Sequence, residues 1–288
     1  MRKGNLFFVL RRLLRPKSGK PIRIFLLRGG LGNQIFQVVG IANLARIHKF
    51  DVILSDYDVR RNPRDKNGAL CFKLNMAAIF GVDTSAIKAD WGIDLFVRIV
   101  SNKFIARKFG PRINLDCGIG DLDKSLAIAH GYLQTKCHVK NFSEKSIAEL
   151  FQIPENLYSD SPAIALHIRA TDGLEREDMR LGHEYYERAL NYFTNGETTL
   201  VDVYTDDISY AKKFCAQIGK HNFNFPEELK SLEPIELLRA LGGYNRIVSS
   251  KSTLCWWACF IAKLGKSKVE VVSPWEAAME LENWFPLK

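Results

Sequence analysis

Apolar runs alternate with amphipathic segments along most of this chain, beginning at Pro21. The apolar runs 23–28 and 51–55 enclose the segment 33–48, whose apolar residues recur at helical spacing. This order predicts a strand, a helix and a second strand, which together open a parallel α/β sheet.

The pattern weakens between about residues 60 and 125, which we interpret as insertions and loops with one helix around 94–108. A buried strand is predicted at 126–130 and a helix at about 144–151. The polar stretch 152–161 contains two prolines and is the candidate linker.

The alternation restarts at residue 163. Strands are predicted at 163–168, 200–204, 246–249 and 269–273, and helices at 183–193, 208–218, 234–241 and 253–264. The economical architecture has two α/β domains with parallel sheets that face a cleft. The expected divisions are a basic N-terminal segment (1–20), a first domain (21–155) and a second domain (156–288).

The composition of the chain indicates that its binding partner is anionic. The chain of 288 residues is 47% hydrophobic and 25% charged, and it carries a net charge of +9. Such a charge suits a phosphate-rich ligand, a nucleic acid or an anionic membrane. Basic residues interleaved with aromatic ones, which single-stranded nucleic-acid binding favours, are not found, so we expect no nucleic-acid partner.

The cellular setting is inferred from what the sequence lacks. The six cysteines show no CxxC pair or zinc-ligand spacing, which indicates reduced cysteines. No apolar run reaches the length of a membrane span, so we expect a cytoplasmic protein. Residues 1–20 combine apolar residues at helical spacing with many lysines and arginines. They form either a helix on the anionic inner membrane face or a solvated or packed leader.

A glycine-rich turn joins the first predicted strand to its helix, with the sequence RGGLGNQ at 28–34. Glycines let backbone amides approach a ligand, and a helix start favours an anion. Asn33 and Gln34 add amide groups that suit hydroxyl-rich substrates. Two alternatives stay open: a simple capping turn, and a nicotinamide-binding turn with Asp56 at the next strand end. Ile35 argues against the second, because a small residue is needed there.

A second motif, HIRATD at 167–172, follows the strand predicted before it. Strand alternation places His167 and Arg169 on one face. Arg169 either forks onto a diphosphate or forms a surface pair with Asp172.

Two further strand exits carry polar residues. In Asp206-Asp207 one carboxylate caps the next helix, and the other either orients Arg169 or contacts a nucleoside. The segment 249–258 places hydroxyls at the start of an apolar helix, which favours an anion. The pair Trp256-Trp257 inside that helix is expected to be core.

Together these segments resemble the bacterial α-1,2-fucosyltransferase family, glycosyltransferase family 11. Its members carry GGLGNQ, GYWQ, HxRRxD, SDD-like and SFSWW-like segments, often with paired tyrosines after HxRRxD. The corresponding residues here are Gly29 to Gln34, Gly131 to Gln134, His167 to Asp172, Thr205 to Asp207 and Ser250 to Trp257, with Tyr185-Tyr186 as the pair.

The resemblance implies a GT-B-like fold with two Rossmann-like domains, GDP-fucose held by the second domain and the acceptor facing the first. It also implies roles for individual residues. The implied donor-binding residues are Gly32, Asn33, Gln34, His167, Arg169, Asp206, Glu236, Ser252 and Thr253. Among them Arg169 would bind the β-phosphate and Glu236 would read guanine.

Three positions depart from the family pattern. The second arginine of HxRRxD is Ala170, the asparagine before the serine pair is Lys251, and the serine before the tryptophans is Cys255. Less positive charge near the diphosphate leaves two alternatives open, another GDP-sugar donor and a non-catalytic nucleotide-binding protein.

The implied reaction is inverting and needs no metal and no other cofactor. Arg169 would stabilise the leaving diphosphate, and the base would be Asp172, Glu175 or Glu177. By resemblance the acceptor is a galactose-type residue of a surface polysaccharide, O-antigen or capsule, on a lipid-linked oligosaccharide. The Asp56-Tyr57-Asp58 segment has the DxD form of metal-dependent transferases, but so short a match is expected by chance.

Overall fold

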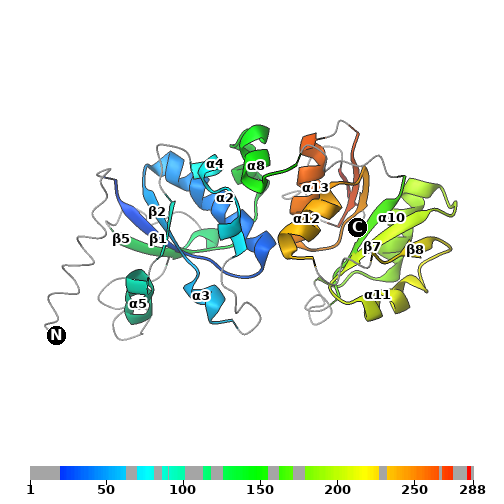
Figure 1. The fold of residues 1–288 in the computed structure, drawn as a ribbon, viewed down its shortest axis with the longest axis horizontal. Helices are drawn as coiled ribbons and strands as arrows, with labels where there is room; N and C mark the ends of the chain where they lie inside the picture. Colours follow the sequence, from blue (N-terminus) through cyan, green and yellow to red (C-terminus); the bar gives the residue numbers. More distant parts are fainter. Residues whose placement is uncertain are drawn as a thin grey trace, which may run out of the picture. The chain divides into compact units, whose positions relative to one another are not determined.

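The computed structural model divides the chain into two compact units, Met1–Gln152 and Ile153–Lys288, each drawn in Figure 1. The residues that the structure describes are 20–62, 70–80, 86–89, 91–100, 113–117, 126–154, 162–170, 179–226, 232–265, 268–274 and 284–286. Among them we find no helix whose length and apolar character would carry it across a bilayer. The basic segment 1–19 lies outside the described residues.

The first unit is built on a parallel sheet of five strands in the order β3-β2-β1-β5-β4. Their bounds are β1 Ile22–Leu26, β2 Asp51–Ser55, β3 Ala86–Lys88, β4 Ile113–Asn114 and β5 Leu126–His130. Central strands of such a sheet are covered on both faces, and all five residues of β1 and of β2 are buried. The strand order reverses between β1 and β5, so the loops that leave these two strands border the crevice of the sheet.

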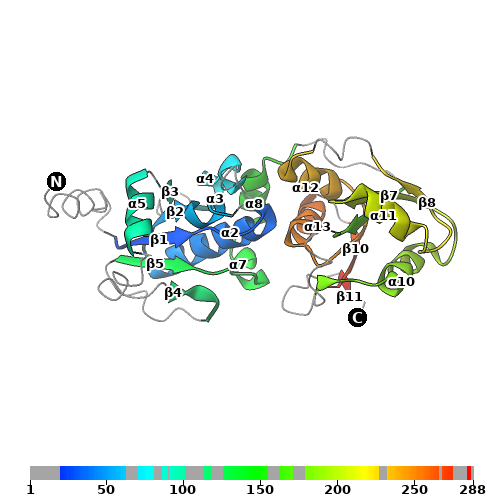
Figure 2. The same cartoon turned by 90° about the horizontal axis from the view of Figure 1, so that it is seen from below.

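Helices cover the two faces of this sheet. Helix α5 (Trp91–Val100) buries Ile93, Phe96 and Val97 against alternate residues of β1. The long helix α2 (Leu31–His48) contacts β2, and 14 of its 18 residues are buried. The shorter helices labelled in Figure 2 are α3 Tyr57–Arg60, α4 Ala77–Phe80, α7 Lys136–Lys140 and α8 Glu144–Phe151. Two 3-10 helices, η1 Leu70–Lys73 and η2 Leu115–Cys117, complete the unit's described elements.

The second unit has a parallel sheet of six strands in the order β11-β10-β9-β6-β7-β8. Their bounds are β6 Ile164–Ile168, β7 Leu200–Thr205, β8 Asn222–Asn224, β9 Arg246–Val248, β10 Glu270–Ser273 and β11 Trp284–Pro286. Counted within this unit, the order is 6-5-4-1-2-3, the doubly wound arrangement of dinucleotide-binding sheets. Its switch point lies between β6 and β9.

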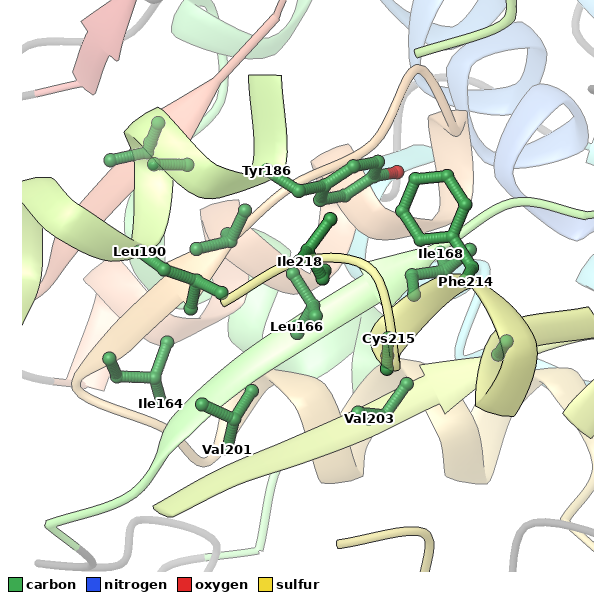
Figure 3. Close-up of a cluster of buried hydrophobic side chains, with 14 residues drawn as sticks. Ile164, Leu166, Ile168, Tyr186, Leu190, Val201, Val203, Phe214, Cys215 and Ile218 are labelled. Atoms are coloured by element: carbon green, nitrogen blue, oxygen red, sulfur yellow. The ribbon is translucent and has the colours of Figure 1, made fainter. Parts of the chain in front are cut away.

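Helices α10 (His183–Thr194) and α11 (Ile208–Cys215) pack on one face of this sheet, where Tyr186, Leu190 and Phe214 cover alternate residues of β6 and β7 (Figure 3). Helices α12 (Pro234–Gly242) and α13 (Thr253–Gly265) pack against each other. They approach closely at Gly242, where an added Cβ would lie 3.0 Å from Ile261 Cγ2.

The predicted fold class, α/β with a parallel sheet in each half, is confirmed. The cleft between the halves stays a prediction. Four strands were not predicted, β3, β4, β8 and β11, and each has three residues or fewer. The helix expected at 94–108 is observed at Trp91–Val100, and residues 101–112 lie outside the described ones.

Candidate functional site

The carboxyl ends of β6 and β9 separate at the switch point of the second sheet. Their last paired residues are Leu166 and Val248. Beyond this pair the end of β6 and the segment that follows β9 are linked by a side-chain contact, because His167 Nδ1 lies 2.7 Å from Ser250 Oγ. In open α/β sheets the ligand-binding crevice lies at this position of the strand order.

His167 is an uncharged histidine at this crevice. It is 3% exposed, and burial, with a further contribution from the Arg169 charge, lowers its pKa to about 4. At neutral pH the imidazole is therefore neutral and available for hydrogen bonding.

Arg169 is oriented by Asp206 at the end of the neighbouring strand β7. One carboxylate oxygen of Asp206 accepts a hydrogen bond from the Ala170 amide at 2.7 Å, and the other lies 3.5 Å from Arg169 Nη1. Both side chains are about one third exposed, so the ion pair itself is weak. Asp207 accepts from the Tyr210 amide and caps α11, so the two aspartates divide the predicted roles of cap and orienting group.

Two tyrosines of α10 satisfy backbone carbonyls at the separated strand ends. The Tyr185 hydroxyl donates to the Ser249 carbonyl at 2.7 Å, and the Tyr186 hydroxyl donates to the His167 carbonyl at 3.3 Å. Burial raises the pKa of both phenols well above the ordinary value, which keeps them as neutral donors. The two tyrosines of α10 thus bind the backbone at the ends of both β6 and β9.

Helix α13 begins at the same crevice. Ser252 is buried, and its carbonyl accepts the Trp256 amide, so the helix starts directly after it. The first amides of a helix have no intrahelical acceptor and favour an anion. Trp256 and Trp257 are fully buried, which confirms their expected place in the core.

Glu236, predicted to read guanine, is engaged at the start of α12. Its Oε2 accepts a hydrogen bond from the Glu233 amide at 2.8 Å as part of a capping box. The carboxylate has further acceptor positions, and its guanine-reading role stays a prediction.

The glycine turn of the first unit is locked by its own side chains. Gly29 has φ +71°, and an added Cβ would lie 2.6 Å from Asn33 Nδ2. Gln34 is 1% exposed; its amide donates to the Gly29 carbonyl at 2.7 Å and accepts from the Cys71 amide at 3.1 Å. In this structure Gln34 therefore ties the turn to η1.

The aspartates of the DxD segment each form an ion pair with an arginine. Asp58 accepts from Arg28 Nε and Nη2 at 3.1 and 3.0 Å, and Asp56 accepts from Arg60 Nε at 2.8 Å. Both carboxylates therefore have a structural role as partners of arginine side chains.

Sequence reasoning named Arg28, Asn33 and Gln134 within motifs but missed His130 and the contacts that join these four residues at the carboxyl end of the first sheet. Arg28 Nη1 lies 3.4 Å from His130 Nδ1, and Gln134 Nε2 donates to Asn33 Oδ1 at 2.8 Å. Both contacts join the exit of β1 to the exit of β5. The signal available was the position of His130 at the end of a predicted strand.

The structure thus separates the predicted site residues into groups. His167, Arg169, Asp206, Ser252 and Thr253 lie at the strand and helix ends bordering the second sheet's switch point. Gly32, Asn33 and Gln34 lie in the first turn of α2 in the other unit, and Glu236 starts α12. The candidate bases Asp172, Glu175 and Glu177 lie outside the described residues.

Comparison with known proteins gives only distant structural likenesses. No family model and no curated protein matches the sequence. Arabidopsis thaliana FUT1 in complex with GDP is 12% identical, with 90% of this chain and 72% of that chain covered and a TM-score of 0.48. Fucosyltransferase NodZ from Bradyrhizobium is 12% identical, covering 84% and 93%, with a TM-score of 0.46. E. coli heptosyltransferase WaaC is 10% identical, covering 93% of each chain, with a TM-score of 0.39. At these values the likenesses assign neither a family nor an activity.

Proposed function

We propose that this protein is an inverting glycosyltransferase that transfers fucose from GDP-fucose to the 2-hydroxyl of a galactose-type acceptor. The observation that carries the proposal lies in the second unit. There a guanidinium, Arg169, and the start of a helix of 13 residues border the switch point of a sheet with dinucleotide-binding strand order. The five ordered motifs that resemble those of the α-1,2-fucosyltransferases support this choice of donor and acceptor class.

In the proposed reaction the acceptor oxygen bonds to the anomeric carbon while the bond from that carbon to the β-phosphate oxygen breaks. Arg169 and the first amides of α13 stabilise the charge that develops on the departing GDP. Neutral His167 adds a hydrogen bond without adding charge. The acceptor proton passes to a carboxylate, for which Asp172, Glu175 and Glu177 are the candidates.

The proposed reaction uses no metal, because a guanidinium and a helix start supply the positive potential that a cation supplies in other transferases. The acceptor is proposed to be a lipid-linked oligosaccharide of surface polysaccharide synthesis, met at the inner membrane face by the basic N-terminal segment. The alternative donor is another GDP-sugar, favoured by Ala170, which removes one positive charge of the family motif.

The test is GDP release from GDP-fucose and a panel of galactosides in excess EDTA, with GDP-mannose as the comparison donor. We expect acceptor-dependent release from GDP-fucose. Arg169→Ala should lower kcat/KM by about 100-fold or more, the effect of removing one strong charge-stabilising donor. Arg188→Ala, at an exposed position on α10, is the matched control and should retain activity.

Three outcomes separate the alternatives. If GDP is released only from GDP-mannose, the proposed binding site stands but the donor is not GDP-fucose. Binding of GDP without any turnover would support the non-catalytic alternative. A protein that binds no GDP at millimolar concentration would contradict the proposed function.

A further inference from the structure

The segment 131–134, directly after β5, is fixed at every position and yet holds one aromatic ring in solvent. The carboxylate of Asp116 accepts the amides of Tyr132 and Leu133, both at 2.8 Å. An added Cβ at Gly131 would lie 3.1 Å from the same carboxylate, a tight contact that a larger residue could make only if Asp116 shifted. The Tyr132 side chain nevertheless leaves the residue 43% exposed. The backbone beneath this ring is therefore held by two hydrogen bonds to one carboxylate.

Leu133 supplies a second anchor. It has φ +52°, which is a strained conformation for a bulky residue, and it is 5% exposed. Its side chain packs onto α2 at Gly40, where an added Cβ would lie 2.7 Å from Leu133 Cβ. Such strain persists only where the surroundings fix it, and it is concentrated at ligand-binding segments. The strained leucine turns inward while the preceding tyrosine is held outward.

Polar groups that suit a sugar follow immediately. The amide pair of Gln134 and Asn33 contains both donors and acceptors. Arg28 and His130 form the neighbouring contact at the same two strand ends. All of these residues border the switch point of the first sheet, where an open α/β sheet binds its ligand.

We propose that Tyr132 is the stacking platform of an acceptor subsite for a hexopyranose ring. The C–H groups on one face of a pyranose carry partial positive charge and pack against the negative face of the phenol ring. Hydroxyls at the edge of that sugar bind the Asn33–Gln134 amide pair. The assignment of this sugar as the acceptor rests on the proposed function, whereas the subsite itself is defined by the segment 131–134.

The test compares Tyr132→Ala with Tyr132→Phe, which keeps the ring. Tyr192→Ala is the matched control, because Tyr192 is equally exposed, at 43%, in the other unit. Initial rates give KM for lactose and for GDP-fucose separately, and saturation-transfer NMR detects lactose binding without turnover. Because the side chain of Tyr132 is exposed, all three variants should unfold at the wild-type temperature.

We expect Tyr132→Ala to raise KM for lactose about tenfold and to leave KM for GDP-fucose unchanged. Tyr132→Phe and Tyr192→Ala should both stay within about twofold of wild type. Asp116→Ala, which keeps the ring but frees its backbone, should raise KM for lactose in the same direction.

A lactose KM within twofold of wild type in Tyr132→Ala would overturn the subsite while leaving the proposed function intact. If the wild-type protein transfers nothing, lactose saturation transfer that is lost in Tyr132→Ala would still support the subsite. Absence of lactose binding to the wild-type protein would overturn it, and GDP binding would then decide the proposed function separately.

Discussion

Removing the hydroxyl of Tyr185 tests how the backbone after β9, at the switch point of the second sheet, is kept in place. In Tyr185→Phe the ring stays and the 2.7 Å bond to the Ser249 carbonyl is lost. The Val272 carbonyl, which the same hydroxyl approaches at 3.4 Å, keeps its bond from the Ser249 amide at 2.9 Å. One buried acceptor is thus left without its donor.

The expected cost follows from that one acceptor. Leaving a buried carbonyl without its partner costs about 1–3 kcal/mol of unfolding free energy. Ser249 adjoins Ser250, the partner of His167, so the loop that leads into α13 loses part of its order. Restoring order to one residue costs about 1 kcal/mol when ligand binds, which corresponds to roughly fivefold weaker GDP binding.

Urea unfolding followed by circular dichroism measures the stability of this variant, and titration calorimetry measures GDP binding. Tyr192→Phe is the control on the same helix, because its ring is 43% exposed and its hydroxyl loss should cost under 0.5 kcal/mol, as expected for a surface change. Wild-type stability and wild-type GDP affinity in Tyr185→Phe would refute the reasoning that this hydroxyl orders the loop.

Two further perturbations test the buried histidine and the glycine turn. The pKa of His167 lies at about 4, below the unfolded value, so the unfolded protein binds the extra proton first and stability should fall as pH drops from about 6.5 to 4. This shift in pKa corresponds to about 3 kcal/mol of unfolding free energy. Urea unfolding at a series of pH values should show that His167→Asn removes this loss of stability, whereas the exposed control His48→Asn retains it. An unchanged pH profile in His167→Asn would contradict the assignment. Gly29→Ala should destabilise the first unit by about 1–3 kcal/mol, because φ is +71° and the new Cβ meets Asn33. Gly30→Ala, whose Cβ meets nothing within 4 Å, should change thermal stability little, and equal effects of the two alanines would disprove the steric argument.

The parallel sheets were predictable because their longer strands are buried on both faces. All five residues of β6 are buried, and all of them except His167 are apolar. The strand β8 has the sequence NFN and an intermediate or exposed surface, so it carries no such pattern. Pairing with β7, rather than its own composition, makes it a strand.

The candidate site was predictable only in part, for a related reason. His167, Arg169 and Asp206 follow apolar strands directly, and strand ends of a parallel sheet lie at one edge. The contact of Tyr185 with Ser249 joins residues 64 positions apart, and that of Asp116 with Tyr132 joins residues 16 apart. Nothing in the local pattern around either partner encodes such a contact, because it depends on the completed fold.

The burial of Ala170 has a consequence for any attempt to add a second arginine beside Arg169. Its methyl group is fully enclosed, and its amide is bound by Asp206. A longer, charged side chain at this position would have to displace its neighbours and lose its hydration. Ala170→Arg is therefore expected to destabilise the second unit before its charge can contribute to binding an anion.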